Sequence, residues 1–149
     1  MFAPMPPFND IYIVTDDRSK NCIDKFLSKY ADLENAKARG DFEVFDGSNY
    51  VETGTLTDTI AYGLADKRRE FVMYFDSAIS RVKSVILFFT PDGKLILGLS
   101  SEYDENSDEE AKRVLAMLKA DFNTDLGVIS LETPPGDAYD FINENLRQF

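Results

Sequence analysis

Two almost continuously apolar runs, VILFF at residues 85–89 and KLILGL at residues 94–99, flank the tetrapeptide TPDG at residues 90–93. In such a turn, proline presets φ at the first central position and glycine accepts a positive φ. Apolar runs on both sides of the turn predict a β-hairpin. Because neither run alternates with polar residues, both faces of the hairpin need cover, which predicts a sheet buried on two sides.

Weaker periodic patterns surround this hairpin. Clusters of β-branched and aromatic residues predict strands at residues 11–14, 42–45, 71–75 and 128–131, with a DGSN turn at residues 46–49. Apolar residues at helical spacing predict a helix that includes residues 23–33 and ends just before Gly40, and further helices over residues 111–122 and 137–149. The sequence predicts a single α+β domain spanning residues 1–149. It consists of a mostly antiparallel central sheet of five to six strands with helices covering both faces, and residues 1–9 form an extended lead-in.

Helix boundaries are marked by capping residues. Ser19 or Asn21 is expected to cap the first helix, and Ser107 with Glu110 matches a capping box at the start of the helix over residues 111–122. Residues 53–69 fit two readings. An apolar stripe and a threonine cap favour a helix. Gly63 would weaken this helix by about 1 kcal/mol relative to alanine, so the sequence does not decide between a helix and a strand here.

The chain has no histidine and one cysteine, Cys22. This excludes Ser-His-Asp and Cys-His nucleophilic systems, histidine-ligated zinc and four-cysteine metal sites. No glycine-rich nucleotide signature occurs. Cys22 lies beside a helical apolar stripe and is predicted to be a small buried hydrophobe. We therefore expect no catalytic residues, no metal site, no cofactor and no enzymatic activity, with a carboxylate- or Mg²⁺-dependent small enzyme as the alternative.

The formal net charge is −11, from 27 acidic and 16 basic residues. Residues 92–149 hold 13 of those acids and 5 of those bases. Such a field predicts a basic protein partner and disfavours direct nucleic-acid or membrane binding. The few basic residues at 67–69 are expected to pair with nearby acids. The N-terminal residues lack the pattern of a signal peptide and no apolar run could cross a bilayer, which predicts a cytoplasmic location.

Residues 102–110 concentrate six acids in nine positions around a tyrosine. Helix capping accounts for the last three acids, but not for the first three. Their mutual repulsion is a cost that a basic partner could relieve, and tyrosine is enriched at binding hot spots. The predicted partner-binding residues are Glu102, Tyr103, Asp104, Glu105 and Glu109.

The segments FVMYF at residues 71–75, KSVILFFTPDGK at residues 83–94 and LILGLS at residues 95–100, with the acidic segment and helix after them, carry a resemblance to a known class. In this stretch the chain resembles the immunity proteins of bacterial contact-dependent-inhibition and polymorphic toxin systems. The resemblance implies a cytoplasmic inhibitor that occludes the active site of a basic toxin domain, often a nuclease at the C-terminus of a secreted or surface effector. An adaptor that binds a protein partner in a salt-insensitive way is a further alternative.

Overall fold

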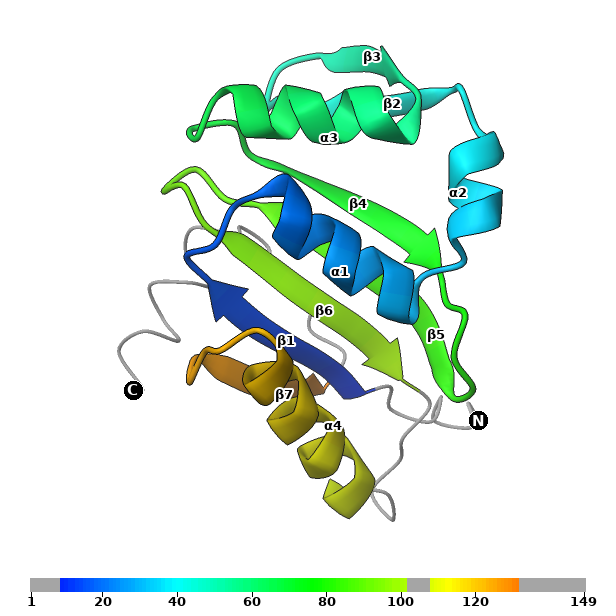
Figure 1. Ribbon diagram of the computed structural model, residues 1–149. Helices are drawn as coiled ribbons and strands as arrows, with labels where there is room; N and C mark the ends of the chain where they lie inside the picture. The colour runs from blue at the N-terminus through cyan, green and yellow to red at the C-terminus, as the bar shows by residue number, and fades with distance from the viewer. Residues whose placement is uncertain (1–8, 102–107, 132–149) are drawn as a thin grey trace, which may run out of the picture.

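The computed structural model describes residues 9–101 and 108–131, which form one α+β domain (Figure 1). The main sheet has five antiparallel strands in the order β4-β5-β6-β1-β7, and β2 and β3 form a separate two-stranded ribbon. The strands are β1 (Asn9–Thr15), β2 (Phe42–Phe45), β3 (Tyr50–Gly54), β4 (Phe71–Asp76), β5 (Val82–Phe89), β6 (Leu95–Ser101) and β7 (Gly127–Leu131). The helices are α1 (Lys20–Tyr30), α2 (Leu33–Ala38), α3 (Leu56–Ala65) and α4 (Asp108–Asp121).

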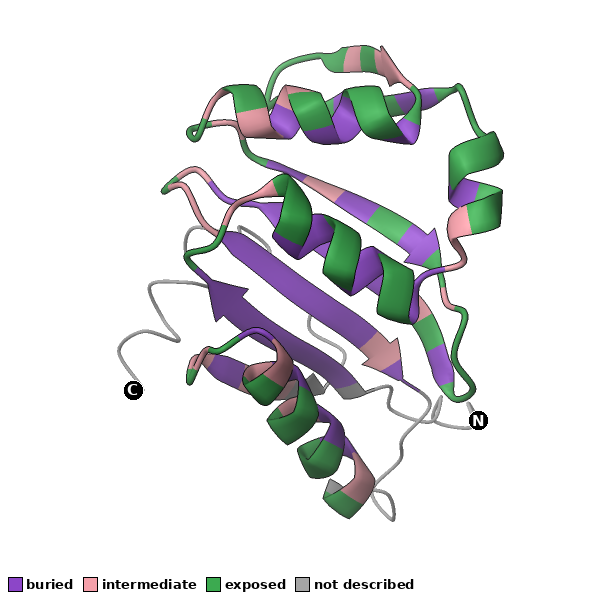
Figure 2. Cartoon of the chain, viewed as in Figure 1, coloured by how far each residue is buried: buried purple, intermediate pink, exposed green. Residues whose placement is uncertain are grey.

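The predicted hairpin is confirmed as β5 and β6, which pair from Val85 with Leu99 to Phe89 with Leu95. The backbone N–H of Thr90 donates to the carbonyl oxygen of Lys94 at 3.1 Å, and Gly93 has a φ of 85°. Both strands are buried over most of their length, and they lie side by side within the sheet (Figure 2). The continuous apolar runs are therefore buried on both faces, as the sequence predicted, and the four described helices contribute to the core on one of these faces.

One face of the sheet carries the larger core. Alternate strand residues such as Ile13, Leu87 and Leu97 pack beneath α1, α3 and α4, which lie over this face (Figure 1). Phe26 of α1 bridges the helices, since its ring centre lies 5.9 Å from that of Phe122 just after α4. All four described helices contribute to this cluster or pack against it.

The opposite face holds a second buried cluster, made of Tyr12, Val14, Ile86, Phe88 and Ile96. Gly98 is required here, because a Cβ at this position would lie 2.6 Å from the Tyr12 ring. The helix predicted over residues 137–149 and most of the predicted N-terminal lead-in lie outside the described residues. The α+β class and the antiparallel sheet are confirmed.

The prediction of one helix that includes residues 23–33 and ends just before Gly40 is wrong, because the structure has two helices there. Ser19 caps α1 as expected, by accepting a hydrogen bond from the backbone N–H of Cys22, but α1 ends at Tyr30. Ala31 is extended and forms an isolated bridge with Ser77, which halts the helix. Asp32 then caps the separate helix α2.

The segment at residues 53–69, for which the sequence did not decide between helix and strand, is mainly helical. Thr55 accepts a hydrogen bond from the backbone N–H of Asp58 and caps α3. Gly63 lies inside this helix because a Cβ there would be 2.5 Å from the ring of Phe89. Packing against the sheet thus outweighs the weak helix propensity of glycine. Strand β3 ends at Gly54, inside the first residues of this segment, and was not predicted.

Arg18 fastens the start of α1 to two other parts of the chain. Its guanidinium donates hydrogen bonds to carbonyl oxygens after β5 and around the end of α3, at Thr90 (2.6 Å), Gly63 (2.8 Å), Asp66 (3.0 Å), Arg69 (3.1 Å) and Lys94 (3.3 Å). Burial lowers the pKa of this guanidinium, but these carbonyls supply the acceptors that a desolvated cation needs. Arg18 therefore has a structural role.

Candidate functional site

The β2–β3 ribbon exposes two aromatic rings to solvent. Phe45 is 47% exposed and Tyr50 is 70% exposed, and their ring centres lie 5.1 Å apart. The two residues are direct cross-strand partners, so the pairing of β2 with β3 holds the rings together. The two adjacent rings form an exposed apolar patch, and apolar patches rimmed by polar residues are a feature of interaction sites.

Two glutamates lie on the same outer face as the rings. Glu43 pairs across the ribbon with Glu52, and both side chains are exposed. Like charges directly opposite each other destabilise a strand pair. The ribbon therefore carries an electrostatic cost that nothing in its own packing explains and that a basic partner could relieve.

Asp46 adds a third carboxylate at the turn of the ribbon. It accepts hydrogen bonds from the backbone N–H groups of Asn49 at 2.7 Å and Ser48 at 2.8 Å. These two bonds hold the pKa of the Asp46 carboxyl below its usual value. Its negative charge is thus fixed beside the aromatic pair. We refer to the surface formed by these carboxylates and rings as the acidic-aromatic face, which consists of Glu43, Phe45, Asp46, Tyr50 and Glu52.

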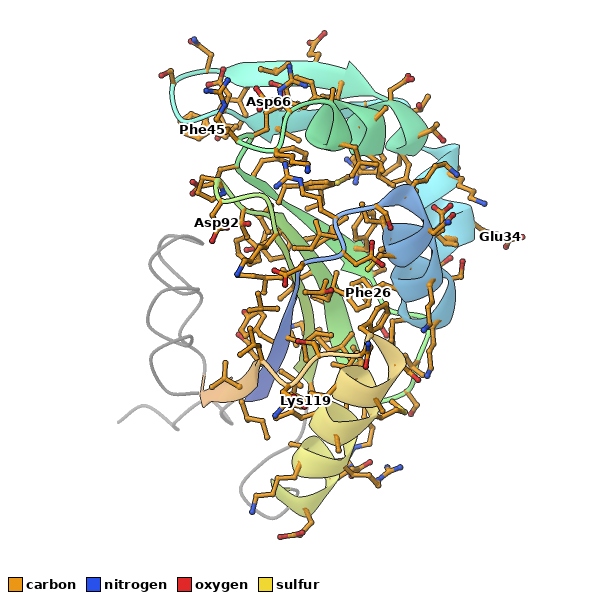
Figure 3. All side chains as sticks on the ribbon, turned by 60° about the vertical axis from the view of Figure 1, so that its left-hand side comes forward. Phe26, Glu34, Phe45, Asp66, Asp92 and Lys119 are labelled. Carbon is orange, nitrogen blue, oxygen red and sulfur yellow. The ribbon has the colours of Figure 1, made fainter. Side chains whose placement is uncertain are left out.

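The inner face of the ribbon anchors it to the domain. Phe42 and Val44 are buried, and the Phe42 ring centre lies 6.5 Å from that of Phe75 in β4. Strand alternation then directs Glu43 and Phe45 outward. The ribbon lies beside α3 at one end of the molecule, and Figure 3 shows Phe45 at this end.

Two of the basic residues near the ribbon make local contacts, and of these it is Arg68 that makes an ion pair with an acid as expected. Arg69 donates to the carbonyl oxygen of Tyr62 at 2.5 Å, and its guanidinium carbon lies 3.8 Å from the centre of the Tyr62 ring. Arg68 lies 3.6 Å from the Asp66 carboxylate. These residues line a hollow of about 480 Å³ behind Asp46. The mixed charges there give no anion-binding surface.

Of the five predicted partner-binding residues, only Glu109 lies within the described residues. Its side chain is 93% exposed at the start of α4, 3.6 Å from the Lys112 ammonium. The start of α4 and the β2–β3 ribbon lie at opposite ends of the molecule (Figure 1). The other four predicted residues, Glu102, Tyr103, Asp104 and Glu105, lie outside the described residues, as does the predicted cap Ser107.

The acidic-aromatic face was missed from the sequence because β3 was not predicted. The alternation of Glu43 and Phe45 with buried residues was readable, and so was the DGSN turn after them. A strand at residues 50–54 would have followed from treating that turn as the centre of a hairpin. The opposition of Glu43 and Glu52 would then have been visible as a local conflict.

Other chemistries find little support among the described residues. Cys22 is 5% exposed, and burial raises the pKa of its thiol to about 11, so it is a poor nucleophile. Residues 9–101 and 108–131 contain no group of three or more cysteine, aspartate or glutamate side chains that could hold a metal ion. No helix in these ranges has the length and apolar character needed to cross a membrane.

Comparison of the chain with protein-family models, with curated proteins and with solved structures finds no match. The fold defines the class, a single α+β domain with an antiparallel sheet, and leaves function to be inferred from the surface.

Proposed function

We propose that this protein is an inhibitor that binds a basic toxin domain and occludes its active site, in the manner of an immunity protein. The observation that carries this proposal is the acidic-aromatic face, in which two exposed rings are framed by three carboxylates. Phe45 and Tyr50 would enter a hollow on the partner, as aromatic anchors do at binding hot spots. Glu43, Asp46 and Glu52 would occupy positions that nucleic-acid phosphates take on a nuclease.

The overall charge supports this role. A net charge of −11 attracts a basic domain over a distance and accelerates its association, which suits an inhibitor that must act before a toxin does. The fixed charge of Asp46 and the unrelieved pair of Glu43 and Glu52 provide the local part of this field. Such electrostatic steering weakens as the salt concentration rises.

The segment around Glu102–Glu105 with Glu109 remains a competing surface for the same partner. Because the start of α4 and the ribbon lie at opposite ends of the molecule, the two surfaces make separate predictions. The salt-insensitive adaptor is a second candidate function, favoured by an apolar groove between α1 and α3. Within residues 9–101 and 108–131, no geometric observation favours a carboxylate- or Mg²⁺-dependent enzyme.

The test starts from a basic protein encoded next to this chain or purified with it from the native host. We expect Tyr50→Ala to weaken binding at least tenfold, as for a hot-spot residue. Glu43→Gln with Glu52→Gln should slow association and flatten its salt dependence. The matched control is Glu34→Gln with Asp125→Asn, which removes the same charge from other exposed positions; Figure 3 shows Glu34 far from Phe45.

Equal effects of the two double variants would show that total charge matters and the ribbon does not. Loss of binding only on neutralising residues 102–105 would move the interface to the competing surface. Binding that is unaffected by salt and by all these variants would favour the adaptor. Inhibition of the partner's activity, measured in the same titration, separates an inhibitor from a passive binder.

A further inference from the structure

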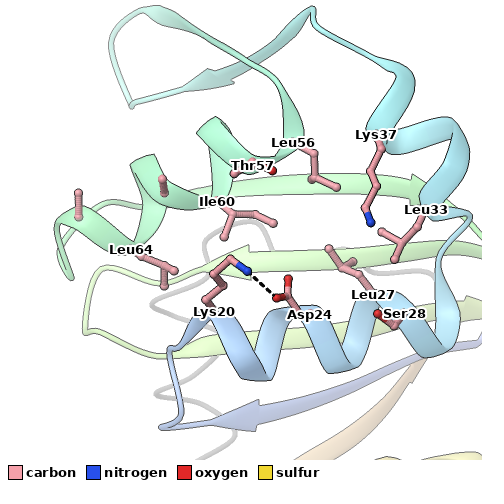
Figure 4. A pocket seen from close by; sticks show the side chains of 12 residues that line it. Lys20, Asp24, Leu27, Ser28, Leu33, Lys37, Leu56, Thr57, Ile60 and Leu64 are labelled. Atoms are coloured by element: carbon pink, nitrogen blue, oxygen red, sulfur yellow. Dashed lines mark hydrogen bonds and ion pairs between the residues drawn. The ribbon is translucent and has the colours of Figure 1, made fainter.

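A groove of about 610 Å³ separates α1 from α3 on the outer side of the larger core (Figure 4). Leu27 of α1 and Ile60 of α3 form its floor, and Leu33 of α2 closes one end with Leu56. Its volume falls in the range of small-molecule binding sites, which are mostly apolar with a few fixed polar groups.

Small side chains keep this groove open. Ser28 on α1 and Ala61 and Ala65 on α3 line the facing surfaces of the two helices. Helices in direct contact pack with their axes about 8–10 Å apart and fill the space between them with side chains. Larger apolar residues at these three positions would close the gap and bury more surface. The open groove instead leaves Leu33 and Leu64 partly exposed.

The charges on the rim are unequal. At one end, Lys20 and Asp24 neutralise each other through an ion pair of 2.9 Å. At the other end, Lys37 has no acidic partner among the residues that the structure describes, and Figure 4 shows its ammonium pointing into the space between Leu33 and Leu56. Despite the negative net charge of the chain, the local arrangement of an ammonium over an apolar groove is complementary to an anion with an apolar tail.

We propose that this groove binds a free aliphatic carboxylate of medium chain length. The chain lies along the apolar floor between α1 and α3, and the carboxylate accepts hydrogen bonds from the Lys37 ammonium. The facing surface of α3 runs from Leu56 to Ala65, about 13 Å at the rise of an α-helix, and this sets the length of chain that fits. This site is independent of the acidic-aromatic face.

The experiment titrates the full chain with decanoate and, separately, with decan-1-ol, while the methyl signals of Leu27, Leu33, Ile60 and Leu64 are followed by NMR. Both ligands should shift these signals. Lys37→Ala should weaken decanoate about tenfold, the loss of one charge-assisted hydrogen bond, and leave decan-1-ol unchanged. The matched control Lys112→Ala, an exposed lysine of α4, should change neither.

A second pair of variants tests the volume of the groove. Ala61→Trp and Ser28→Leu fill it from opposite walls, at positions exposed enough to keep the fold, and each should abolish binding of both ligands. Decanoate that leaves the four residues' signals unmoved, or binds equally to Lys37→Ala, overturns the assignment. The assignment is also overturned if Ala61→Trp or Ser28→Leu blocks binding of a protein partner while decanoate does not bind the unaltered protein. The groove then holds a segment of that partner.

Discussion

The β5–β6 hairpin and the β2–β3 ribbon are both antiparallel strand pairs joined by short turns, but they differ in what their faces contact. In β5 and β6, most side chains on both faces are buried. In the ribbon, Phe42 and Val44 face the core, whereas Glu43 and Phe45 face solvent. The comparison shows that the β5–β6 hairpin stabilises the domain. The β2–β3 ribbon instead presents charged and aromatic side chains that a partner could contact.

The ribbon also tolerates a conflict that the main sheet does not contain. Glu43 and Glu52 oppose each other at a modest cost, because water screens both carboxylates. An equivalent pair inside β5 or β6 would be prohibitive, since buried like charges cannot be solvated. Changes in the sheet should therefore alter stability, and changes in the ribbon should alter binding.

The largest effect is expected for Leu97→Ala. Leu97 is fully buried opposite Leu87, and its truncation leaves a cavity in the larger core. The free energy of unfolding should fall by about 2–5 kcal/mol, measured by urea denaturation. Partner binding by the molecules that remain folded should be unchanged. A loss below 1 kcal/mol would contradict the assignment of β6 to the centre of the core.

Arg18→Met should cost about 2–3 kcal/mol, because it leaves carbonyl oxygens without their charged donor. Arg18→Lys should recover only part of this loss, since an ammonium cannot match the planar fork of a guanidinium. Chemical denaturation of both variants gives the comparison. Equal stability of wild type and Arg18→Met would remove the proposed structural role.

Gly98→Ala should cost about 1–3 kcal/mol, because the added Cβ meets the Tyr12 ring at 2.6 Å. The matched control is Gly40→Ala, where a Cβ has no neighbour within 4 Å and φ is not positive. Thermal unfolding should show a lower midpoint for the first variant and an unchanged or slightly raised one for the second. A similar response of both would contradict the close packing on the second face.

The smallest effect has the opposite sign. Glu52→Gln removes one of the opposed charges and should raise the free energy of unfolding by about 0.5 kcal/mol, while weakening binding of a basic partner. Asp125→Asn, at an exposed position outside the helices and strands, serves as the surface control. A variant that gains stability and keeps full affinity would break the link between the strained ribbon and binding.

The sequence-based predictions were accurate where a feature depends on residues close together in the chain, and inaccurate where it depends on distant ones. The β5–β6 hairpin and strand β7 depend on adjacent residues and were predicted correctly, and Ser19 is the observed one of the two caps expected for α1. The end of α1 was not predicted correctly, because Ala31 is drawn into a bridge with Ser77, far along the chain. Of the predicted partner-binding residues, Glu109 alone is described, and its exposure does not test its role.

By itself, the sequence determined the class of the domain, since apolar periodicity decides which segments must be buried on one face or two. It also excluded histidine-based chemistry and determined that the net charge of the protein is negative. Only the tertiary structure decided that Glu43 faces Glu52, that Phe45 and Tyr50 remain exposed, and that α1 and α3 leave a groove beside Lys37. These features depend on strand register and on the spacing of packed helices, which arise from contacts between residues distant in the chain.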